Sequence, residues 1–180
     1  MKKFVRFALA AFLFAPLFAG AQEVNALPRP DPAVAEFARG VKFTVAGYNG
    51  GSEVQTNFPV LVRLSTAISG FTYSDFYADG SDLSLVDIGF VDAEGNGLAY
   101  EIDTWNPSGE SLVWVNLPRM TNGTEFAMWY RSSKTGKELN SDNVWADYTG
   151  VWHLNESGSG SANPKTEVND SSSNVLHGTA

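Results

Sequence analysis

The chain has 180 residues, of which 43% are hydrophobic and 13% aromatic, and its formal net charge is -8. This length suits one ordinary globular domain, and the acidic balance disfavours nucleic acid and anionic lipid as partners. The sequence contains no cysteine, which excludes disulfide bonds, thiol catalysis and thiolate metal sites.

The N-terminus has the three parts of a secretory signal peptide. Basic residues precede an uncharged apolar run over 7–18, which ends in the small-residue triplet Ala19-Gly20-Ala21. This run is shorter than the roughly 18 apolar residues that a membrane-spanning helix requires. We therefore expect residues 1–21 to be removed, and the mature chain to reach the periplasm, the cell surface or the medium without membrane insertion.

Residues 22–40 are predicted to be a proline-rich linker. Three prolines at alternate positions favour extended polyproline geometry. Apolar residues then recur at helical spacing after Pro32, which predicts a short helix that ends before Gly40. The linker is either a free tether or is held to the domain by a contact of Phe37.

Residues 41–148 are predicted to form an all-β domain, an antiparallel, jelly-roll-like β-sandwich. The runs 41–48 and 58–64 alternate apolar and polar residues, as half-buried strands do. Four further strand-length runs between 79 and 130 are separated by turn-forming clusters, which is typical of a β-meander. In these four runs, the side chains expected in the core are Val86, Ile88, Phe90, Leu98, Tyr100, Ile102, Val113, Val115, Leu117, Phe126, Met128 and Tyr130.

One strand changes its apolar face along its length. Leu83 and Leu85 share one parity, whereas Val86 and the apolar residues after it share the other. Because an inserted residue turns every later side chain to the opposite face, this pattern predicts a β-bulge near Leu85–Val86.

Three tryptophans are the candidate ligand-binding residues. Trp105, Trp114 and Trp129 each fall on the parity opposite the most apolar side chains of their strand, so we expect them on an outer sheet face. Exposed aromatic rows on a β-sandwich can stack against the apolar faces of sugar rings. The competing interpretation is that these side chains pack under loops or against a neighbouring domain.

Other polar patterns have simpler explanations. Glu101 and Asp103 lie about 7 Å apart on one strand face, which is compatible with glycoside hydrolysis by paired carboxylates and equally with a solvated strand. Residues 92–97 have the early spacing of a calcium loop, but a hairpin turn at Asn96-Gly97 explains them. His153 has no partner at metal-ligand spacing. We therefore predict no catalytic residue, no metal site and no cofactor.

Several sequence blocks carry a family resemblance. They are DGSDLSLVD, YEIDTW, LVWVNLP and TEFAMWYRS, followed by NVWADYTGVWHLNE. In content and order they resemble a bacterial envelope family known only as a domain of unknown function. The resemblance covers residues 41–156 and implies a β-sandwich, and it supplies no catalytic residues.

The same resemblance implies a second domain. In similar proteins GVWHLNE commonly opens a concanavalin A-like, or laminin G-like, domain, and residues 170–179 resemble its next landmark. Residues 149–180 are therefore expected to be the truncated start of such a domain. A Gly/Ser-rich connector occupies 157–162, and we expect the tail after Glu156 to be disordered.

The sequence thus predicts a non-catalytic, exported β-sandwich module of a larger envelope or extracellular protein that binds carbohydrate or another surface polymer. One alternative is a structural spacer or sensory head, because proteins that resemble this chain are sometimes joined to MotA/TolQ/ExbB-type proton channels. Another is an accessory domain of an exported glycan hydrolase. The expected partners are polysaccharides or envelope proteins, and neither nucleic acid nor membrane.

Overall fold

The computed structural model describes residues 27, 37–76, 86–132, 143–154 and 167–179. Its described elements are β-strands, apart from one turn of 3-10 helix at Tyr73–Asp75. The predicted all-β class is therefore confirmed. The predicted signal peptide, 1–21, lies outside the described residues.

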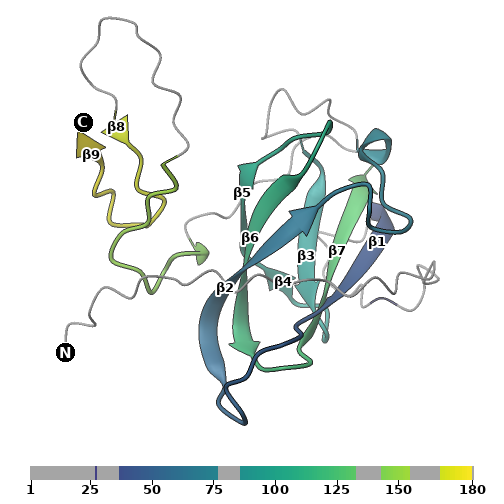
Figure 1. Ribbon diagram of the computed structural model, residues 1–180, viewed down its shortest axis with the longest axis horizontal. Helices are drawn as coiled ribbons and strands as arrows, with labels where there is room; N and C mark the ends of the chain where they lie inside the picture. Colours follow the sequence, from purple (N-terminus) through teal and green to yellow (C-terminus); the bar gives the residue numbers. More distant parts are fainter. Residues whose placement is uncertain (1–26, 28–36, 77–85, 133–142, 155–166, 180) are drawn as a thin grey trace, which may run out of the picture.

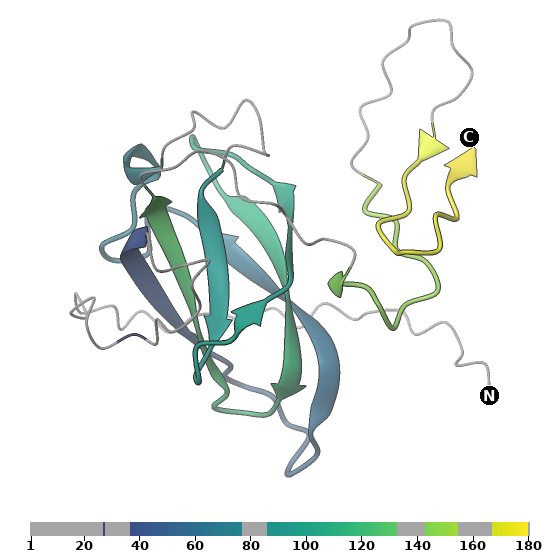
Figure 2. The same ribbon diagram turned by 180° about the vertical axis from the view of Figure 1, so that it is seen from behind.

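Two antiparallel sheets form the sandwich (Figure 1). The first sheet has the order β1-β7-β3-β4 and consists of β1 (Phe37–Thr44), β7 (Glu125–Ser132), β3 (Ile88–Asp92) and β4 (Gly97–Leu98). The second has the order β2-β6-β5 and consists of β2 (Gln55–Leu64), β6 (Ser111–Met120) and β5 (Tyr100–Thr104). Seen from behind, in Figure 2, the two sheets form two facing layers. The predicted antiparallel β-sandwich is confirmed.

The connections between strands differ from the predicted meander. Only Ala99 separates β4 from β5, and the chain passes there from the first sheet to the second. After β6 the chain returns to the first sheet, where β7 lies between β1 and β3. The predicted meander is therefore wrong, since its strands do not all pair with their neighbours in sequence. Where the chain crosses between sheets, the next strand buries its apolar face against the sheet that the chain has just left.

The space between the sheets is filled by the predicted side chains. Every core residue expected between Val86 and Tyr130 is buried and belongs to one continuous cluster. Burying one such aliphatic side chain contributes about 1.5–3 kcal/mol. The Tyr100 hydroxyl also donates a 2.7 Å hydrogen bond to the Ile88 carbonyl, which joins the second sheet to the first.

A smaller apolar cluster covers the outer face of the first sheet. Trp129, with no exposed surface, packs there with Phe37 and Leu27. Phe37 begins β1 and pairs in register with Ser132, so the helix predicted to end before Gly40 is wrong from Phe37 onward. Pairing with β7 satisfies the backbone of residues 37–40 and outweighs their helical spacing. The contact predicted for Phe37 is present, and the linker residues 22–26 and 28–36 lie outside the described residues.

A register shift occurs in β5, at a position where the sequence indicated none. Ile102 is paired with Val113, whereas Thr104 is paired with Leu112, so the pairing with β6 shifts between Ile102 and Thr104. The bulge predicted near Leu85–Val86 falls partly outside the described residues. The shift in β5 reverses the inward and outward parity of the residues that follow it.

The C-terminal residues form a small separate hairpin. β8 (Glu167–Val168) pairs with β9 (Gly178–Thr179), and Trp152 forms a β-bridge with Asp170. The expectation of disorder after Glu156 is therefore wrong for residues 167–179. Buried hydrogen bonds to Asp170, described below, give this segment its order.

Candidate functional site

The outer face of the second sheet is covered by residues 143–154, here called the covering segment. Its backbone is held by Asn116 of β6, whose side-chain Nδ2 donates to the Val144 carbonyl at 2.9 Å and to the Asn143 carbonyl at 3.4 Å. Val144 and Trp145 are buried by this contact, at 0% and 2% exposure. Asn116, on the outward parity of β6, thus attaches a distant part of the chain to the second sheet.

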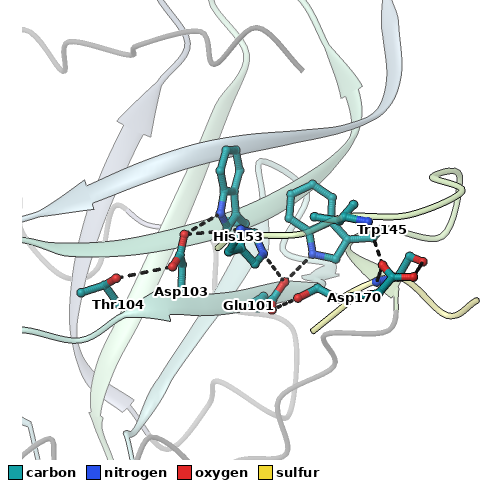
Figure 3. Close-up of polar contacts among 10 residues, drawn as sticks. Glu101, Asp103, Thr104, Trp145, His153 and Asp170 are labelled. Carbon is teal, nitrogen blue, oxygen red and sulfur yellow. Dashed lines mark hydrogen bonds and ion pairs between the residues drawn. The ribbon is translucent and has the colours of Figure 1, made fainter. Parts of the chain in front are cut away.

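Glu101 of β5 is the centre of this contact. Its Oε2 accepts a hydrogen bond from the Trp145 indole, and its Oε1 accepts one from the Ser171 hydroxyl at 2.8 Å. His153 Nε2 lies 3.5 Å from Oε2. One carboxylate therefore joins β5 to the covering segment and to residues 167–179, here called the tail (Figure 3).

The environment of Glu101 favours its charged form. Burial opposes ionisation of this carboxyl, but the hydrogen bonds from His153, Trp145 and Ser171 outweigh burial and hold its pKa below the usual value of 4.5. Glu101 is therefore ionised in its docked position at neutral and mildly acidic pH.

Asp103 repeats this arrangement two residues along β5. Its Oδ2 accepts a 3.2 Å hydrogen bond from the Trp114 indole of β6 and lies 3.6 Å from His153 Nδ1. Figure 3 shows His153 lying over the two carboxylates. The His153 ring also stacks 6.1 Å from Trp114 and lies 5.6 Å from Trp145, so it is enclosed by carboxylates and indoles.

The tail is organised by a second carboxylate, Asp170. Its oxygens accept hydrogen bonds from the backbone N–H groups of Val151, Ser172 and Leu176 at 2.7–2.9 Å, and from the Ser172 hydroxyl at 2.9 Å. Burial raises the pKa of Asp170, but these hydrogen bonds outweigh burial and hold the pKa below its usual value. Because Val151 precedes His153 by two residues, Asp170 ties the tail to the covering segment.

These two segments also carry exposed apolar side chains. In the described part of the chain, the exposed large hydrophobic residues are Trp152, Leu154, Val175 and Leu176, at 44%, 73%, 59% and 49% exposure. The Trp152 indole is fixed in place, since its Nε1 donates to the Leu176 carbonyl at 3.0 Å. Among the described residues, the exposed large hydrophobic side chains thus all belong to the covering segment and tail.

The three predicted tryptophans lie in three different environments. Trp105 packs on the main core, 5.4 Å from Tyr73 and 4.8 Å from Phe76, because the register shift in β5 turns it inward. Trp114 is on the outer face of the second sheet, as predicted, but lies beneath His153 and Trp145. Trp129 is on the outer face of the first sheet beneath other apolar side chains. They form no common row, and the competing interpretation of packing under other segments describes all three.

The two acidic patterns also have clear structural roles. Asp92 accepts hydrogen bonds from the backbone N–H groups of Glu94 and Asn96 and from the Asn96 side chain, so the predicted hairpin turn accounts for residues 92–97. Glu101 and Asp103 do share a strand face, although that face is covered. Within the described ranges, no group of three metal-ligating side chains is placed to hold an ion.

Several residues of this contact were not identified from the sequence. The sequence pattern indicates no role for Trp145, Asn116, Ser171 or Asp170, and it offers His153 no partner at metal-ligand spacing. Their only signal was that Glu101 and Trp114, now paired across β5 and β6, both point outward. An acidic side chain beside a large aromatic one on an outer face indicates a surface that another segment covers.

The fold and site define a two-sheet β-sandwich module that holds a C-terminal segment on its second sheet. A family model described as Domain of unknown function (DUF2341) matches residues 84–157. Residues 84–157 are therefore similar to this family, which confirms the resemblance to a domain of unknown function. The matched region includes Glu101, Asp103, Trp114, Trp145 and His153. No curated protein and no solved structure matches the chain.

Proposed function

We propose that the chain is a non-catalytic spacer module of a larger exported envelope protein, and that it holds the segment after its sandwich in a fixed orientation. The observation that carries this proposal is the triple attachment at Glu101, which contacts Trp145, His153 and Ser171. A flexible connector would have no need of buried polar contacts to the preceding domain.

The state of the two carboxylates supports the absence of catalysis. A glycoside hydrolase needs its acid and its base open to a substrate. Glu101 and Asp103 instead have side chains only 17% and 13% exposed, and each already accepts a hydrogen bond from an indole. Substrate access would require displacement of the covering segment.

Export is part of the same proposal and rests on the N-terminal sequence. No helix among the described residues is long and apolar enough to cross a membrane. The natural partner of a spacer is the next domain of its own polypeptide or a neighbouring envelope protein. The exposed apolar residues of the covering segment and tail suit such a contact.

Binding of a surface polysaccharide is a second candidate, and it is favoured by Trp152. Trp152 is 44% exposed and its indole is held by a hydrogen bond to the Leu176 carbonyl, so it offers a rigid surface for a sugar ring. The three tryptophans first expected in this role all have packing partners. If the chain binds a polysaccharide, the candidate binding residue is therefore Trp152 of the covering segment and not a tryptophan of the sandwich.

The spacer proposal is tested by NMR relaxation of the exported chain, residues 22–180. We expect residues 143–154 and 167–179 to share the rotational correlation time of β2 and β6. Glu101→Ala should release them, whereas the matched variant Glu94→Ala, which removes an exposed turn carboxylate, should not. Independent tumbling of the two segments in the unaltered chain would contradict the proposal.

Polysaccharide binding has its own test, retention on insoluble polysaccharides. If the second candidate is correct, Trp152→Ala should abolish retention, and Val175→Ala, which removes an exposed aliphatic side chain, should preserve it. A folded chain that no polysaccharide retains would rule out this candidate and leave the spacer function unaffected.

A further inference from the structure

His153 is placed so that both nitrogens of its imidazole face a carboxylate. Nε2 lies 3.5 Å from Oε2 of Glu101, and Nδ1 lies 3.6 Å from Oδ2 of Asp103. The His153 side chain is 13% exposed. Two acidic groups on one strand thus hold one titratable group of the covering segment (Figure 3).

The protonation state of the imidazole decides whether this arrangement is favourable. A neutral imidazole has one N–H, so it can donate to one carboxylate while its other nitrogen presents a lone pair to the second. The protonated ring donates at both nitrogens and also offsets part of the negative charge. Only the protonated form of His153 satisfies Glu101 and Asp103 together.

The groups around this cluster do not compete with such titration. The ring is contacted by Trp114 from β6 and Trp145 from the covering segment, and Glu101 is contacted by Ser171 from the tail. Indoles and hydroxyls do not titrate near neutral pH. In proteins, imidazole is the side chain whose charge ordinarily changes between pH ~5 and ~8.

We propose that protonation of His153 locks the covering segment and tail onto the second sheet, and that its deprotonation loosens them. This inference rests on the proposed spacer function, since it concerns the same contact, and it adds regulation by the pH outside the cell membrane. The hold is strongest in mildly acidic solution, where the imidazole is charged and Glu101 is still ionised. It weakens toward alkaline pH.

The test uses thiol labelling, because the chain has no cysteine of its own and a single introduced cysteine is a unique probe. Val144→Cys places a thiol in the covering segment where it is buried, and Ser108→Cys places one in an exposed turn. Both thiols react faster as the pH rises, because the thiolate is the reactive form. The ratio of the two labelling rates at each pH removes this common effect and measures how often the covering segment opens. We expect the protection of the Val144 position to fall about tenfold between pH 6 and pH 8.

Two histidine variants assign the effect, since the chain has only two histidines. His153→Gln, added to each cysteine probe, should make the protection independent of pH over this range. His177→Gln should leave the pH dependence intact, because its Oε1 can still accept the hydrogen bond that Nδ1 of His177 accepts from the Asp170 backbone. The same slope in the His153→Gln background would overturn the proposal.

The outcomes separate this inference from the spacer function. High protection that does not change between pH 6 and pH 8 would refute the pH control and leave the spacer intact. A Val144 thiol as reactive as the Ser108 thiol at every pH would refute both. If the cysteine variants misfold, the Trp145 indole N–H signal in the unaltered chain answers the question, since its chemical shift should follow the titration of His153. A shift that ignores that titration would also refute the proposal.

Discussion

Trp145 donates its indole N–H to Oε2 of Glu101, a residue 44 positions earlier in the chain. This hydrogen bond lies between a strand of the second sheet and the segment that covers that sheet. Trp145 is 2% exposed, so its donor would be buried without a partner if Glu101 were absent. The attachment of the covering segment therefore depends on a polar contact as well as on apolar packing.

Glu101→Gln should weaken this attachment without unfolding the sandwich. The amide keeps one acceptor, but it loses the charge that faces His153 and replaces the second acceptor by a donor. We expect a loss of about 1–3 kcal/mol in the free energy of opening of residues 144–153. Amide hydrogen exchange measures this opening directly. Glu94→Gln is the control, and equal effects of both variants would contradict the role of Glu101.

Acid should release the covering segment through the same residue. Because hydrogen bonding lowers the folded-state pKa of Glu101 below 4.5, its ionised form stabilises the docked state. That contribution is complete above the unfolded pKa and is lost as the pH falls through the folded pKa. We expect exchange protection of residues 144–153 to decrease from pH 5 to pH 3, with a smaller decrease in Glu101→Gln. An identical decrease in both proteins would assign the acid response to other carboxyls.

The order of the tail should depend on Asp170. Its carboxylate accepts from three backbone N–H groups and one hydroxyl, whereas an asparagine would direct its own amide N–H groups at some of these donors. Asp170→Asn should cost about 1–3 kcal/mol in local stability, seen as lost exchange protection at Ser172 and Leu176. Asp147→Asn is the matched control on an exposed aspartate. Unchanged exchange protection at Ser172 and Leu176 in Asp170→Asn would show that the order of the tail does not depend on the Asp170 carboxylate.

The sandwich core was predictable because strand pleating is a local property. Residues such as Val113, Val115 and Leu117 alternate with outward side chains, and this period alone places them between the sheets. The prediction failed where a distant segment decides the outcome. The position of β1 depends on its pairing with β7, and the side to which Trp105 turns depends on the register shift after Ile102.

The contact on the second sheet was harder to predict for the same reason. The outward positions of Glu101 and Trp114 follow from the alternation, but what covers them lies far along the chain, at Trp145 and His153. The expected domain boundary between residues 148 and 149 falls between those two covering residues. Local pattern identifies an outer face, and only the tertiary fold shows whether it is solvated.

Truncation of Trp129 and of Trp152 to alanine should change the free energy of unfolding by very different amounts. Trp129 has no exposed surface and packs with Phe37 and Leu27, so Trp129→Ala should cost about 3–5 kcal/mol in the free energy of unfolding. Trp152 is 44% exposed, and Trp152→Ala should cost at most about 1 kcal/mol. Urea denaturation measures both. Similar costs would mean that Trp129 lacks the cover that Phe37 and Leu27 provide.

Gly40→Ala tests how closely β1 approaches Leu27 and Trp129. A Cβ at this position would lie 2.4 Å from the Leu27 side chain and 3.2 Å from the Trp129 ring. Both neighbours must shift, so we expect a loss of about 1–3 kcal/mol in the free energy of unfolding, measured with urea. Gly40→Ala combined with Leu27→Ala should recover part of the loss that the added methyl group causes, because one of its two contacts is removed. A stabilising effect of the single substitution would contradict the close packing of Gly40 against Leu27 and Trp129.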